Sequence, residues 1–389
     1  MMMHPDEVAG LTGLFTEQER QIAASVRALC AAEVEPNVAR WFEEGELDDP
    51  RGLMRSLGSL GVLGMHLEGY GCGGMSATEY GVACLELEAC DSGVRSMVSV
   101  QGSLAMFAIW RWASEDEKQR WLPGMAKGEL VGCFGLTEPD HGSDPAHMRT
   151  RARRDGADWI IDGRKMWITN GSLAHVAVIW AQTDEGIRGF AVPTETAGFT
   201  ANTIKHKMSL RASVTSELVL DGVRVPDSAA FPEVRGLRGP LSCLSEARYG
   251  IVWGAMGAAR TAIECAQRYA ADREQFGRPI GGFQLTQQKL ADMSLEYIKG
   301  MLLAVHLGRT KDATGLRPEQ VSLGKLNNVR EAIEICRTAR TILGANGISL
   351  EYPVMRHANN LESVLTYEGT VEMHTLIVGQ KLTGQDAFR

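Results

Sequence analysis

The chain has 389 residues, of which 44% are hydrophobic, and it carries a formal net charge of −8. This length allows two or three domains with a substantial core. The negative balance, without a long basic run, argues against a nucleic-acid partner. No apolar run approaches the ~18–20 residues that span a bilayer, so we expect no membrane segment.

Cysteine and histidine usage points to neither a disulfide framework nor a metal centre. The eight cysteines form no Cys-x-x-Cys pair, and several lie within apolar helical patterns, which favours reduced thiols in a cytoplasmic protein. The nine histidines include no His-Glu-x-x-His motif, so no metal site is predicted. The first eight residues lack the basic and apolar regions of a secretory signal.

The first third of the chain has helical periodicity. Apolar spacing predicts helices from about residue 22 to Pro36, over 50–60 and 76–90, and from Ser92 to about Ala113. The glycine-rich segment Glu68–Gly74 follows no convincing strand and lacks a proper Gly-x-Gly-x-x-Gly. It therefore predicts a turn and not a dinucleotide-binding loop.

The character of the sequence changes near Gly132 and again after Pro240. Short β-rich segments lie around residues 159–163, 166–169, 176–180, 189–192 and 217–225, with no long helical pattern between them, so they predict an antiparallel sheet or barrel. Long helical periods then return over about 243–272, 282–314 and 318–343. The last is expected to end where glycine adopts a left-handed cap at Leu343-Gly-Ala-Asn-Gly347.

Near the C-terminus, the segment Leu365-Thr-Tyr-Glu-Gly-Thr-Val371 precedes a short amphipathic helix. Thr370 suits the N-cap, which leaves Glu368 just outside the helix beside a glycine that allows close approach. A carboxylate held there against apolar surface would have a raised pKa and could act as a base. A solvated acid in an ordinary loop is the alternative.

Three polar segments are candidates for binding an anion or a flat cofactor. The loop Leu136-Thr-Glu-Pro-Asp-His-Gly-Ser-Asp144 offers hydroxyls and accessible N–H groups, and Lys165-Met-Trp-Ile-Thr-Asn170 places an indole beside a threonine. Asp272-Arg-Glu-Gln-Phe-Gly277 adds a guanidinium at the end of a helix. An ordinary turn and a buried structural tryptophan are the competing interpretations for the first two.

Arg95 is unusual because it lies in an otherwise apolar helical start. A buried guanidinium is costly unless an anion meets it. One interpretation is ion pairing with Glu88, although Ser92-Gly93 is expected to break the helix between them. The other is recognition of a ligand carboxylate, assisted by the hydroxyls of Ser96 and Ser99.

Together these motifs resemble, in order and spacing, the acyl-CoA dehydrogenase family over essentially the whole chain. The motifs are Phe134–Asp144, Trp167–Thr169, Asp272–Phe276, Leu343–Gly347 and Tyr367–Thr370. The resemblance implies an α+β, mainly α, fold with an N-terminal helical domain (1–133), a central β-barrel domain (134–238) and a C-terminal four-helix bundle (239–389). It also implies FAD, an acyl-CoA substrate, an electron-transfer flavoprotein as acceptor and a homotetramer.

Residue roles follow from the resemblance position by position. Glu368 matches the catalytic base. The positions that match substrate contacts are Glu88, Arg95, Ser96, Ser99, Ser143, Arg248, Tyr367 and Gly369. Those that match flavin contacts are Phe134, Leu136, Thr137, Gly142, Ser143, Trp167, Ile168, Thr169, Phe276, Leu343 and Thr370. Arg273, Gln284, Gly344 and Ala345 match flavin contacts made by a neighbouring subunit.

Within the family the chain is most similar to the glutaryl-CoA dehydrogenase group, through Asp91–Gln101, Ser209–Ser213 and Ala247–Gly250. This implies oxidative decarboxylation of glutaryl-CoA to crotonyl-CoA and CO2, with Arg95 holding the distal carboxylate. Val94, Cys72 and Ser245-Glu246 depart from the group's pattern. They leave open a flavoenzyme of the same fold, a dehydrogenase, oxidase or oxygenase, that acts on another carboxylated or aromatic acyl-thioester in a biosynthetic pathway.

Overall fold

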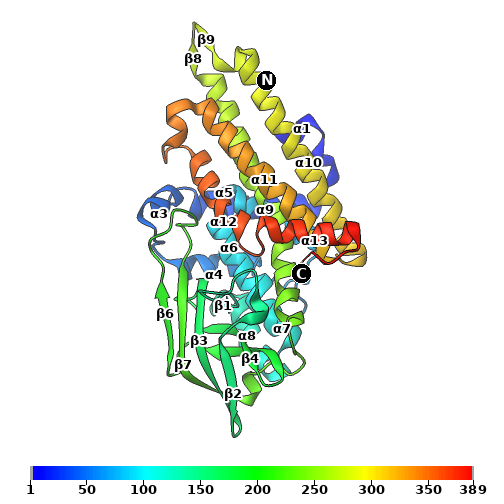
Figure 1. The fold of residues 1–389 in the computed structure, drawn as a ribbon. Helices are drawn as coiled ribbons and strands as arrows, with labels where there is room; N and C mark the ends of the chain where they lie inside the picture. The colour runs from blue at the N-terminus through cyan, green and yellow to red at the C-terminus, as the bar shows by residue number, and fades with distance from the viewer. Residues whose placement is uncertain (1–2, 388–389) are drawn as a thin grey trace.

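The computed structural model describes residues 3–387, so the first two and last two residues of the predicted terminal domains lie outside it. The C-terminal helices and the first N-terminal helices form one half of the molecule, and the sheet formed by the middle of the chain lies in the other half, with the N-terminal helices of residues 107–126 beside it (Figure 1). The α+β, mainly α fold expected from the sequence is confirmed.

The N-terminal region is helical, as predicted. Its helices are α1 (Pro5–Val8), α2 (Glu17–Leu29), α3 (Val38–Glu44), α4 (Pro50–Leu60), α5 (Ala77–Cys90), α6 (Ser92–Ser99), α7 (Phe107–Trp112) and α8 (Glu115–Ala126). Two π-helical segments, η2 (Cys30–Val34) and η3 (Val100–Met106), interrupt what apolar spacing had predicted as continuous helices. The turn expected at Glu68–Gly74 is present.

The middle region is a curled seven-stranded sheet in the order β1-β4-β2-β3-β7-β6, with β5 paired to β4. Its strands are β1 (Gly132–Gly135), β2 (Arg151–Asp155), β3 (Asp158–Thr169), β4 (Val176–Thr183), β5 (Gly186–Pro193), β6 (Phe199–Thr203) and β7 (Thr215–Pro226).

The expectation of an antiparallel sheet is only partly correct. β1 runs parallel to β4, with Phe134 opposite Val178, and β2 meets β4 in parallel at Arg151 and Gln182. The β2–β3 hairpin lies between β1 and β4 in the chain, and this long connection allows the parallel pairing. β1, β2 and β6 were not predicted: β1 has only four residues, two of them glycines, and most residues of β2 and β6 are polar and exposed, so none has a clear apolar alternation.

The C-terminal helices pack against α5 as well as against each other. They are α9 (Arg238–Asp272), α10 (Gln284–Thr314), α11 (Pro318–Leu343), α12 (Pro353–Thr366) and α13 (Val371–Thr383), with a two-stranded hairpin of β8 (Glu274–Gln275) and β9 (Arg278–Pro279). Glycine does end α11 as expected, but the predicted left-handed cap is wrong, because Gly344 combines φ +60° with ψ −131°. None of the helices within residues 3–387 is long and apolar enough to cross a membrane.

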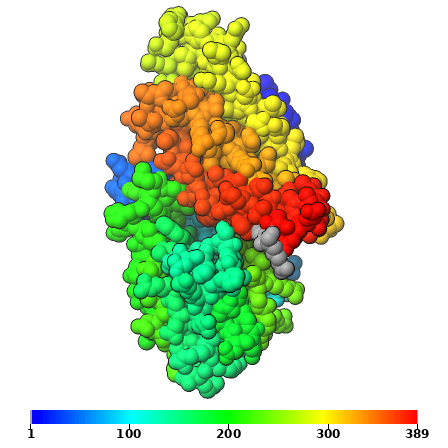
Figure 2. All heavy atoms as spheres, in the orientation of Figure 1, coloured from blue at the N-terminus to red at the C-terminus, as the bar shows by residue number. Residues whose placement is uncertain are grey.

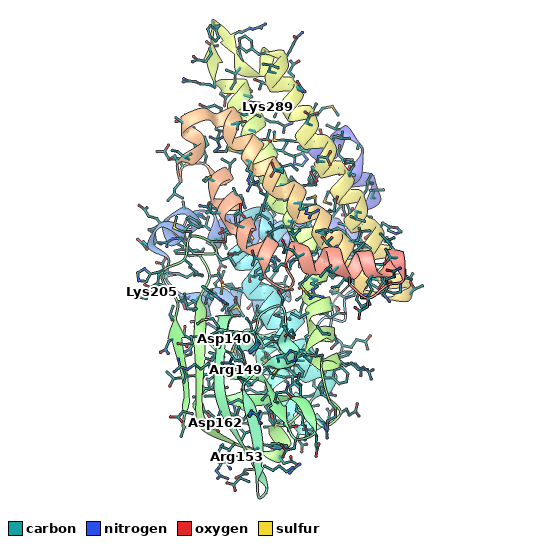
Figure 3. All side chains as sticks on the ribbon, viewed as in Figure 1. Asp140, Arg149, Arg153, Asp162, Lys205 and Lys289 are labelled. Atoms are coloured by element: carbon teal, nitrogen blue, oxygen red, sulfur yellow. The ribbon has the colours of Figure 1, made fainter. Side chains whose placement is uncertain are left out.

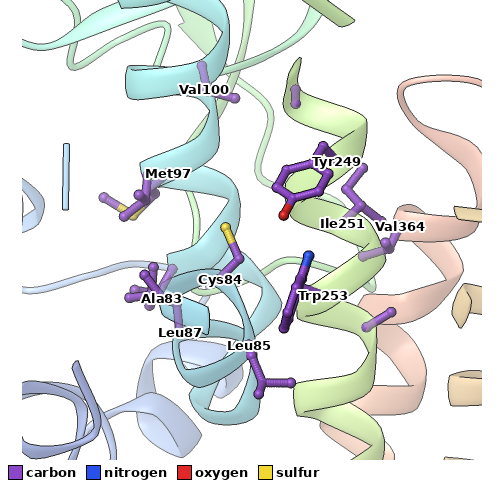
Figure 4. Close-up of a cluster of buried hydrophobic side chains, with 14 of the residues drawn as sticks. Ala83, Cys84, Leu85, Leu87, Met97, Val100, Tyr249, Ile251, Trp253 and Val364 are labelled. Carbon is purple, nitrogen blue, oxygen red and sulfur yellow. The ribbon is translucent and has the colours of Figure 1, made fainter. Parts of the chain in front are cut away.

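The core of the helical half lies where the N-terminal and C-terminal helices meet. Cys84 and Leu85 on α5 lie on the side facing Trp253 of α9, and Ile251 on the other side of α9 lies beside Val364 of α12 (Figure 4). All five side chains are buried. The first and last thirds of the chain therefore share one core, although the sheet separates them in sequence.

Glycines allow α5 and α9 to approach this closely. A Cβ at Gly257 would lie 2.0 Å from the Leu85 carbonyl oxygen, so Gly257→Ala must push the two helices apart. We expect it to lower the free energy of unfolding by about 1–3 kcal/mol, the usual cost of overpacking. Thermal unfolding of the purified variant measures this.

Gly379→Ala in α13 is the matched control. No atom lies within 4 Å of its added Cβ, so the better helix propensity of alanine should leave stability unchanged or raise it by up to ~1 kcal/mol. Equal losses in the two variants would contradict the close α5–α9 contact.

Candidate active site

Glu368 lies in the four-residue connection Tyr367–Thr370 between α12 and α13. Thr370 caps α13 by accepting a hydrogen bond from the N–H of Met373, 3.4 Å away, as the sequence predicted. Glu368 has φ +54° and Gly369 has φ +108°. A left-handed conformation is costly for a residue with a side chain, so the surroundings must hold Glu368 in place.

The carboxylate of Glu368 is buried close to several charged side chains. The residue as a whole is partly exposed, but Oε2 is buried and has no hydrogen-bond partner among the described residues. Burial raises the pKa of Glu368, and the cations of Arg95, Lys325 and Arg248 oppose that rise. A carboxylate with a raised pKa is suited to accept a proton near neutral pH.

Arg95 and Glu88 form a buried ion pair. Nε of Arg95 lies 2.6 Å from Oε2 of Glu88, and neither side chain has any solvent exposure. Nη2 of Arg95 donates to the hydroxyl of Tyr367, the residue next to Glu368. Asp91 ends α5 and caps α6, so the helix is broken as expected and the two residues still meet.

Several polar atoms around this pair are buried without partners among residues 3–387. They are Oε1 of Glu88, Nη1 of Arg95, Oγ of Ser92, Oγ of Ser99 and Oε2 of Glu368. Buried polar groups in proteins almost always have a partner, so a cluster of exceptions indicates a site for a polar ligand. Ser96, also predicted here, is buried on α6.

The charges that act on Glu368 do not cancel. Three cations, on Arg95, Lys325 and Arg248, are opposed by two carboxylates, those of Glu88 and Glu368 itself. Arg248 also donates to the backbone oxygen of Glu368 over 2.6 Å. Burial lowers the pKa of Lys325 to about 7, so the cluster has excess positive charge while that ammonium is protonated, and an anionic ligand then matches it better.

A second group of predicted residues gathers on the sheet. β1 leads into the loop that contains Thr137, whose carbonyl accepts from the N–H of Met166 over 2.9 Å. Lys165, fully buried, donates to the carbonyl of Leu136 at 3.0 Å and to Glu138 at 2.9 Å. The loop before Ser143 is thus fixed to β3, while Gly142 and Ser143 themselves are exposed.

Trp167 projects from an irregularity in β3. The β3–β7 register shifts between Lys165 and Ile168, and Trp167 has φ +63° and an exposed fraction of 59%. Thr169 beside it is partly exposed, whereas Phe134, Leu136 and Ile168 are buried. An exposed indole next to a fixed polar loop fits a flat aromatic cofactor such as a flavin.

The chain matches acyl-CoA dehydrogenases along almost its entire length. Residues 16–129, 133–223 and 234–383 match the family's N-terminal, middle and C-terminal domains. The protein belongs to the acyl-CoA dehydrogenase family.

Individual relatives agree with this assignment. A crystal structure of glutaryl-CoA dehydrogenase from Mycobacterium smegmatis is 69% identical, with a TM-score of 0.98 and complete coverage of both chains. A glutaryl-CoA dehydrogenase from the same organism in complex with FADH2 is 63% identical, again with a TM-score of 0.98 and complete coverage. The human mitochondrial short-chain specific acyl-CoA dehydrogenase is 34% identical over 86% of this chain and 82% of its own length.

The remaining cofactor residues predicted for this acyl-CoA dehydrogenase lie elsewhere. Arg273, Phe276 and Gln284 are exposed around the β8–β9 hairpin, at the opposite end of the molecule from the sheet (Figure 1). Lys289, on the same stretch of α10, is far from Asp140 and Arg149 beside the sheet loop (Figure 3). Gly344 and Ala345 are exposed after α11, and Leu343 is buried in the bundle. One chain therefore does not bring the two groups together.

Two buried residues near Glu368 were missed by the sequence analysis. Lys325 on α11 is 2% exposed and donates to the carbonyls of Tyr367 and Gly369 at 2.5 and 2.6 Å. His374 on α13 is buried, and burial lowers its pKa to about 3, so its ring is neutral. A lysine among the buried positions of α11, four residues after Val321, was the available signal.

Other sites that could compete as the active centre are weaker. A cavity of about 490 Å³, lined by residues including Arg27, Arg260 and Glu264, contains none of the predicted site residues. Within residues 3–387 no group of three or more histidine, cysteine or acidic side chains could hold a metal ion. The unpartnered atoms around Arg95 and Glu368 are the stronger indication of a ligand.

The buried ion pair between Glu138 and Lys165 can be tested as the contact that holds the sheet loop against β3. Attraction by Lys165 and hydrogen bonds from the N–H groups of Arg149 and Thr150 overcome burial and lower the pKa of Glu138 to about 2. Glu138→Gln should leave the Lys165 ammonium buried without a counter-charge and lower the unfolding free energy by roughly 3–5 kcal/mol. Denaturant unfolding of the purified variants measures the difference.

Glu217→Gln is the control for that loss. Its partner Arg164 neighbours Lys165 in sequence but is exposed and 3.4 Å away, so the change should cost only about 0–1 kcal/mol. A Glu138 variant as stable as the control would show that the buried pair does not hold the loop.

Proposed function

We propose that the protein is an FAD-dependent acyl-CoA dehydrogenase whose substrate is glutaryl-CoA, which it oxidises and decarboxylates to crotonyl-CoA and CO2. The observation that carries the choice of acyl group is the excess buried cation beside Glu368, with Nη1 of Arg95 and Oγ of Ser99 unpartnered. A substrate with a distal carboxylate supplies the missing charge and acceptors. The 69% identity to a glutaryl-CoA dehydrogenase supports the same choice.

In this proposal Glu368 removes the α-proton of the thioester. The developing enolate needs a hydrogen-bond donor at its oxygen. The N–H of Glu368 has no acceptor among the described residues and is available for that role. Bound FAD supplies the acceptor for the hydride that leaves the β-carbon. Exclusion of water by the surrounding helices keeps the electrostatic interactions strong.

Decarboxylation follows from the position of the second carboxylate. Once the α,β double bond exists, the bond from the γ-carbon to the carboxylate can break, and its electron pair is delocalised toward the thioester. The protonated Glu368 then returns its proton to the γ-carbon, which gives crotonyl-CoA. Tyr367 keeps its proton because burial raises its pKa, so it remains a hydrogen-bond donor at this end of the site.

The cofactor residues are assigned to two subunits. We propose that FAD lies against Thr137, Trp167 and Thr169 of one chain and against Arg273 and Gln284 of a neighbour. Support comes from the exposed Trp167 and from exposed apolar side chains around the far hairpin, with Phe276 at 95% and Leu285 at 74%. We propose a homotetramer, as in the family, with an electron-transfer flavoprotein as acceptor.

The departures from the group's sequence pattern do not remove the carboxylate site. Val94 is fully buried beside Arg95, where it adds apolar surface without taking a hydrogen bond from the guanidinium. Glu246 forms an ion pair with Lys311. Neither residue occupies the unpartnered atoms of Arg95, so the predicted anion position is retained.

The decisive experiment uses glutaryl-CoA labelled at its free carboxyl. We expect the anaerobic FAD-loaded enzyme to bleach its flavin, and turnover with an artificial acceptor to release labelled CO2 and crotonyl-CoA. Glu368→Gln should bind the substrate but reduce flavin roughly 10²–10⁴-fold more slowly, the usual value of a general base. Bleaching without label release would restrict the enzyme to dehydrogenation. Bleaching only by other acyl-CoAs would reject the glutaryl assignment.

Arg95 should set the preference for a carboxylated acyl chain. Arg95→Met is expected to lower kcat/KM for glutaryl-CoA by about 10²-fold or more relative to butyryl-CoA, because a buried carboxylate without its cation costs roughly 3–5 kcal/mol. The ratio of the two kcat/KM values is the measurement.

The same substitution leaves Glu88 uncompensated, so a stability control is needed. The double variant Arg95→Met/Glu88→Gln removes both charges and should recover stability without recovering the preference for glutaryl-CoA. Parallel losses on both substrates in the double variant would make Arg95 a structural residue only.

A further inference from the structure

Three consecutive backbone carbonyls around the proposed base are held by cationic side chains of the helical bundle. Nζ of Lys325 donates to the carbonyl of Tyr367 at 2.5 Å and to that of Gly369 at 2.6 Å. Nε of Arg248 donates to the carbonyl of Glu368 at 2.6 Å. The first three of the four carbonyls in the connection are therefore fixed from α9 or α11.

These contacts oppose the intrinsic preference of the backbone. Glu368 has φ +54°, a conformation that costs about 1–2 kcal/mol for a residue with a Cβ. Relaxation to negative φ requires rotation of the adjoining peptide units. Because one ammonium group binds the carbonyls on both sides of Glu368, that rotation would break at least one partly buried hydrogen bond to a charged donor, which costs free energy.

Lys325 has an unusual set of partners for a buried cation. It is 2% exposed, and its hydrogen bonds go to carbonyl oxygens and not to a carboxylate. Burial lowers its pKa to about 7, and the attraction of Glu368 opposes that fall. Lys325 and Glu368 thus affect each other electrostatically without a direct hydrogen bond.

We propose that Lys325 is a positioning residue for the dehydrogenation, which holds Glu368 in its left-handed conformation and sets the charge state of its carboxylate. This rests on the proposed function of Glu368 as the base. Lys325 does not touch the reacting atoms in this proposal. It acts through the backbone on both sides of the base and through its own positive charge.

The effect on pH dependence follows from all charged groups that face Glu368. They are Glu88 on α5, Arg95 on α6, Arg248 on α9 and Lys325 on α11, with Tyr367 and Cys84 also close and neutral His374 on α13. The three cations favour the carboxylate form, and Glu88 disfavours it. Removal of the Lys325 charge must therefore raise the pKa of Glu368 and move its titration to higher pH.

The test titrates Glu368 directly and does not depend on turnover. In the FAD-loaded protein, the infrared carboxyl band that disappears in Glu368→Gln reports its protonation as the pH changes. We expect this titration to lie at higher pH in Lys325→Met and in Lys325→Gln than in the wild type. Lys325→Arg keeps the charge and should leave the titration near its wild-type position.

Anaerobic reduction by butyryl-CoA separates geometry from charge. Lys325→Met loses both carbonyl contacts and should reduce flavin about 10²-fold more slowly at every pH, the expected scale for a misplaced base. Lys325→Gln retains an amide donor, so its rate of flavin reduction should fall less than that of Lys325→Met. The pH below which its rate declines should be raised as in Lys325→Met. If Lys325→Met does not fold, the Gln and Arg variants decide the proposal through the titration.

Lys207 provides the matched control. It is also a largely buried lysine, with a pKa lowered by burial to about 8, and it donates to the carbonyls of Leu210 and Ser213. Lys207→Met should lower stability and leave the Glu368 titration in place. An unmoved titration in both Lys325→Met and Lys325→Gln would overturn the proposal. A wild type that no acyl-CoA reduces would instead reject the proposed function, and the infrared titration would then still show whether Lys325 sets the charge state of Glu368.

Discussion

A guanidinium and a carboxylate without any solvent exposure face each other where α5 ends and α6 begins, and much of the molecule is arranged to permit it. Desolvation makes such a pair costly, and removal of one partner typically destabilises a protein by about 3–5 kcal/mol. Asp91 stops α5 and caps α6 so that Arg95 can meet Glu88. On the other side, Gly254 of α9 leaves room for the carboxylate, because a Cβ there would lie 2.0 Å from Oε2.

The same pair connects distant parts of the chain. Arg95 reaches Tyr367, and the carbonyls that follow are held by Arg248 and Lys325. The end of the site that would take the acyl chain thus comes from the N-terminal helices, and the base comes from the connection between α12 and α13. The C-terminal segment that contains α12 and α13 lies directly above the middle region of the chain on the face shown in Figure 2, so the helices that flank the base adjoin the sheet domain. No single region carries the chemistry alone.

Much of this arrangement could be predicted because it depends on local patterns. Apolar periodicity located the long helices, and the N-cap at Thr370 placed Glu368 outside α13. Ion pairing and anion binding were alternatives for Arg95, yet the structure supports both roles, since Nε meets Glu88 and Nη1 remains unpartnered. The sequence could not establish the Arg95–Glu88 ion pair, because the two residues lie on different helices and their contact depends on how the chain turns at Asp91.

Lys325 and the parallel β1–β4 pair were not predicted for a related reason. Lys325 lies 43 positions before Glu368, and the β1–β4 pair joins strands that are separated by the β2–β3 hairpin. Neither contact leaves a short-range pattern in the sequence. Lysine on the buried face of a helix is a detectable exception to ordinary burial, but its partners are backbone carbonyls, which every residue has. The sequence could therefore have identified Lys325 as an unusual buried lysine, but it could not have identified the carbonyls that Lys325 binds.

Backbone conformation provides an independent indication of where the site lies. Among the described residues, those other than glycine with positive φ are Tyr70, Trp167, Asn170, Leu210, Phe276 and Glu368. Three of the six, Trp167, Phe276 and Glu368, were assigned to catalysis or cofactor binding from sequence alone. Such conformations persist only where surrounding contacts enforce them. At Glu368 those contacts are named: two cations bind three successive carbonyls, so the stability of the helical bundle is what keeps the proposed base in a strained position.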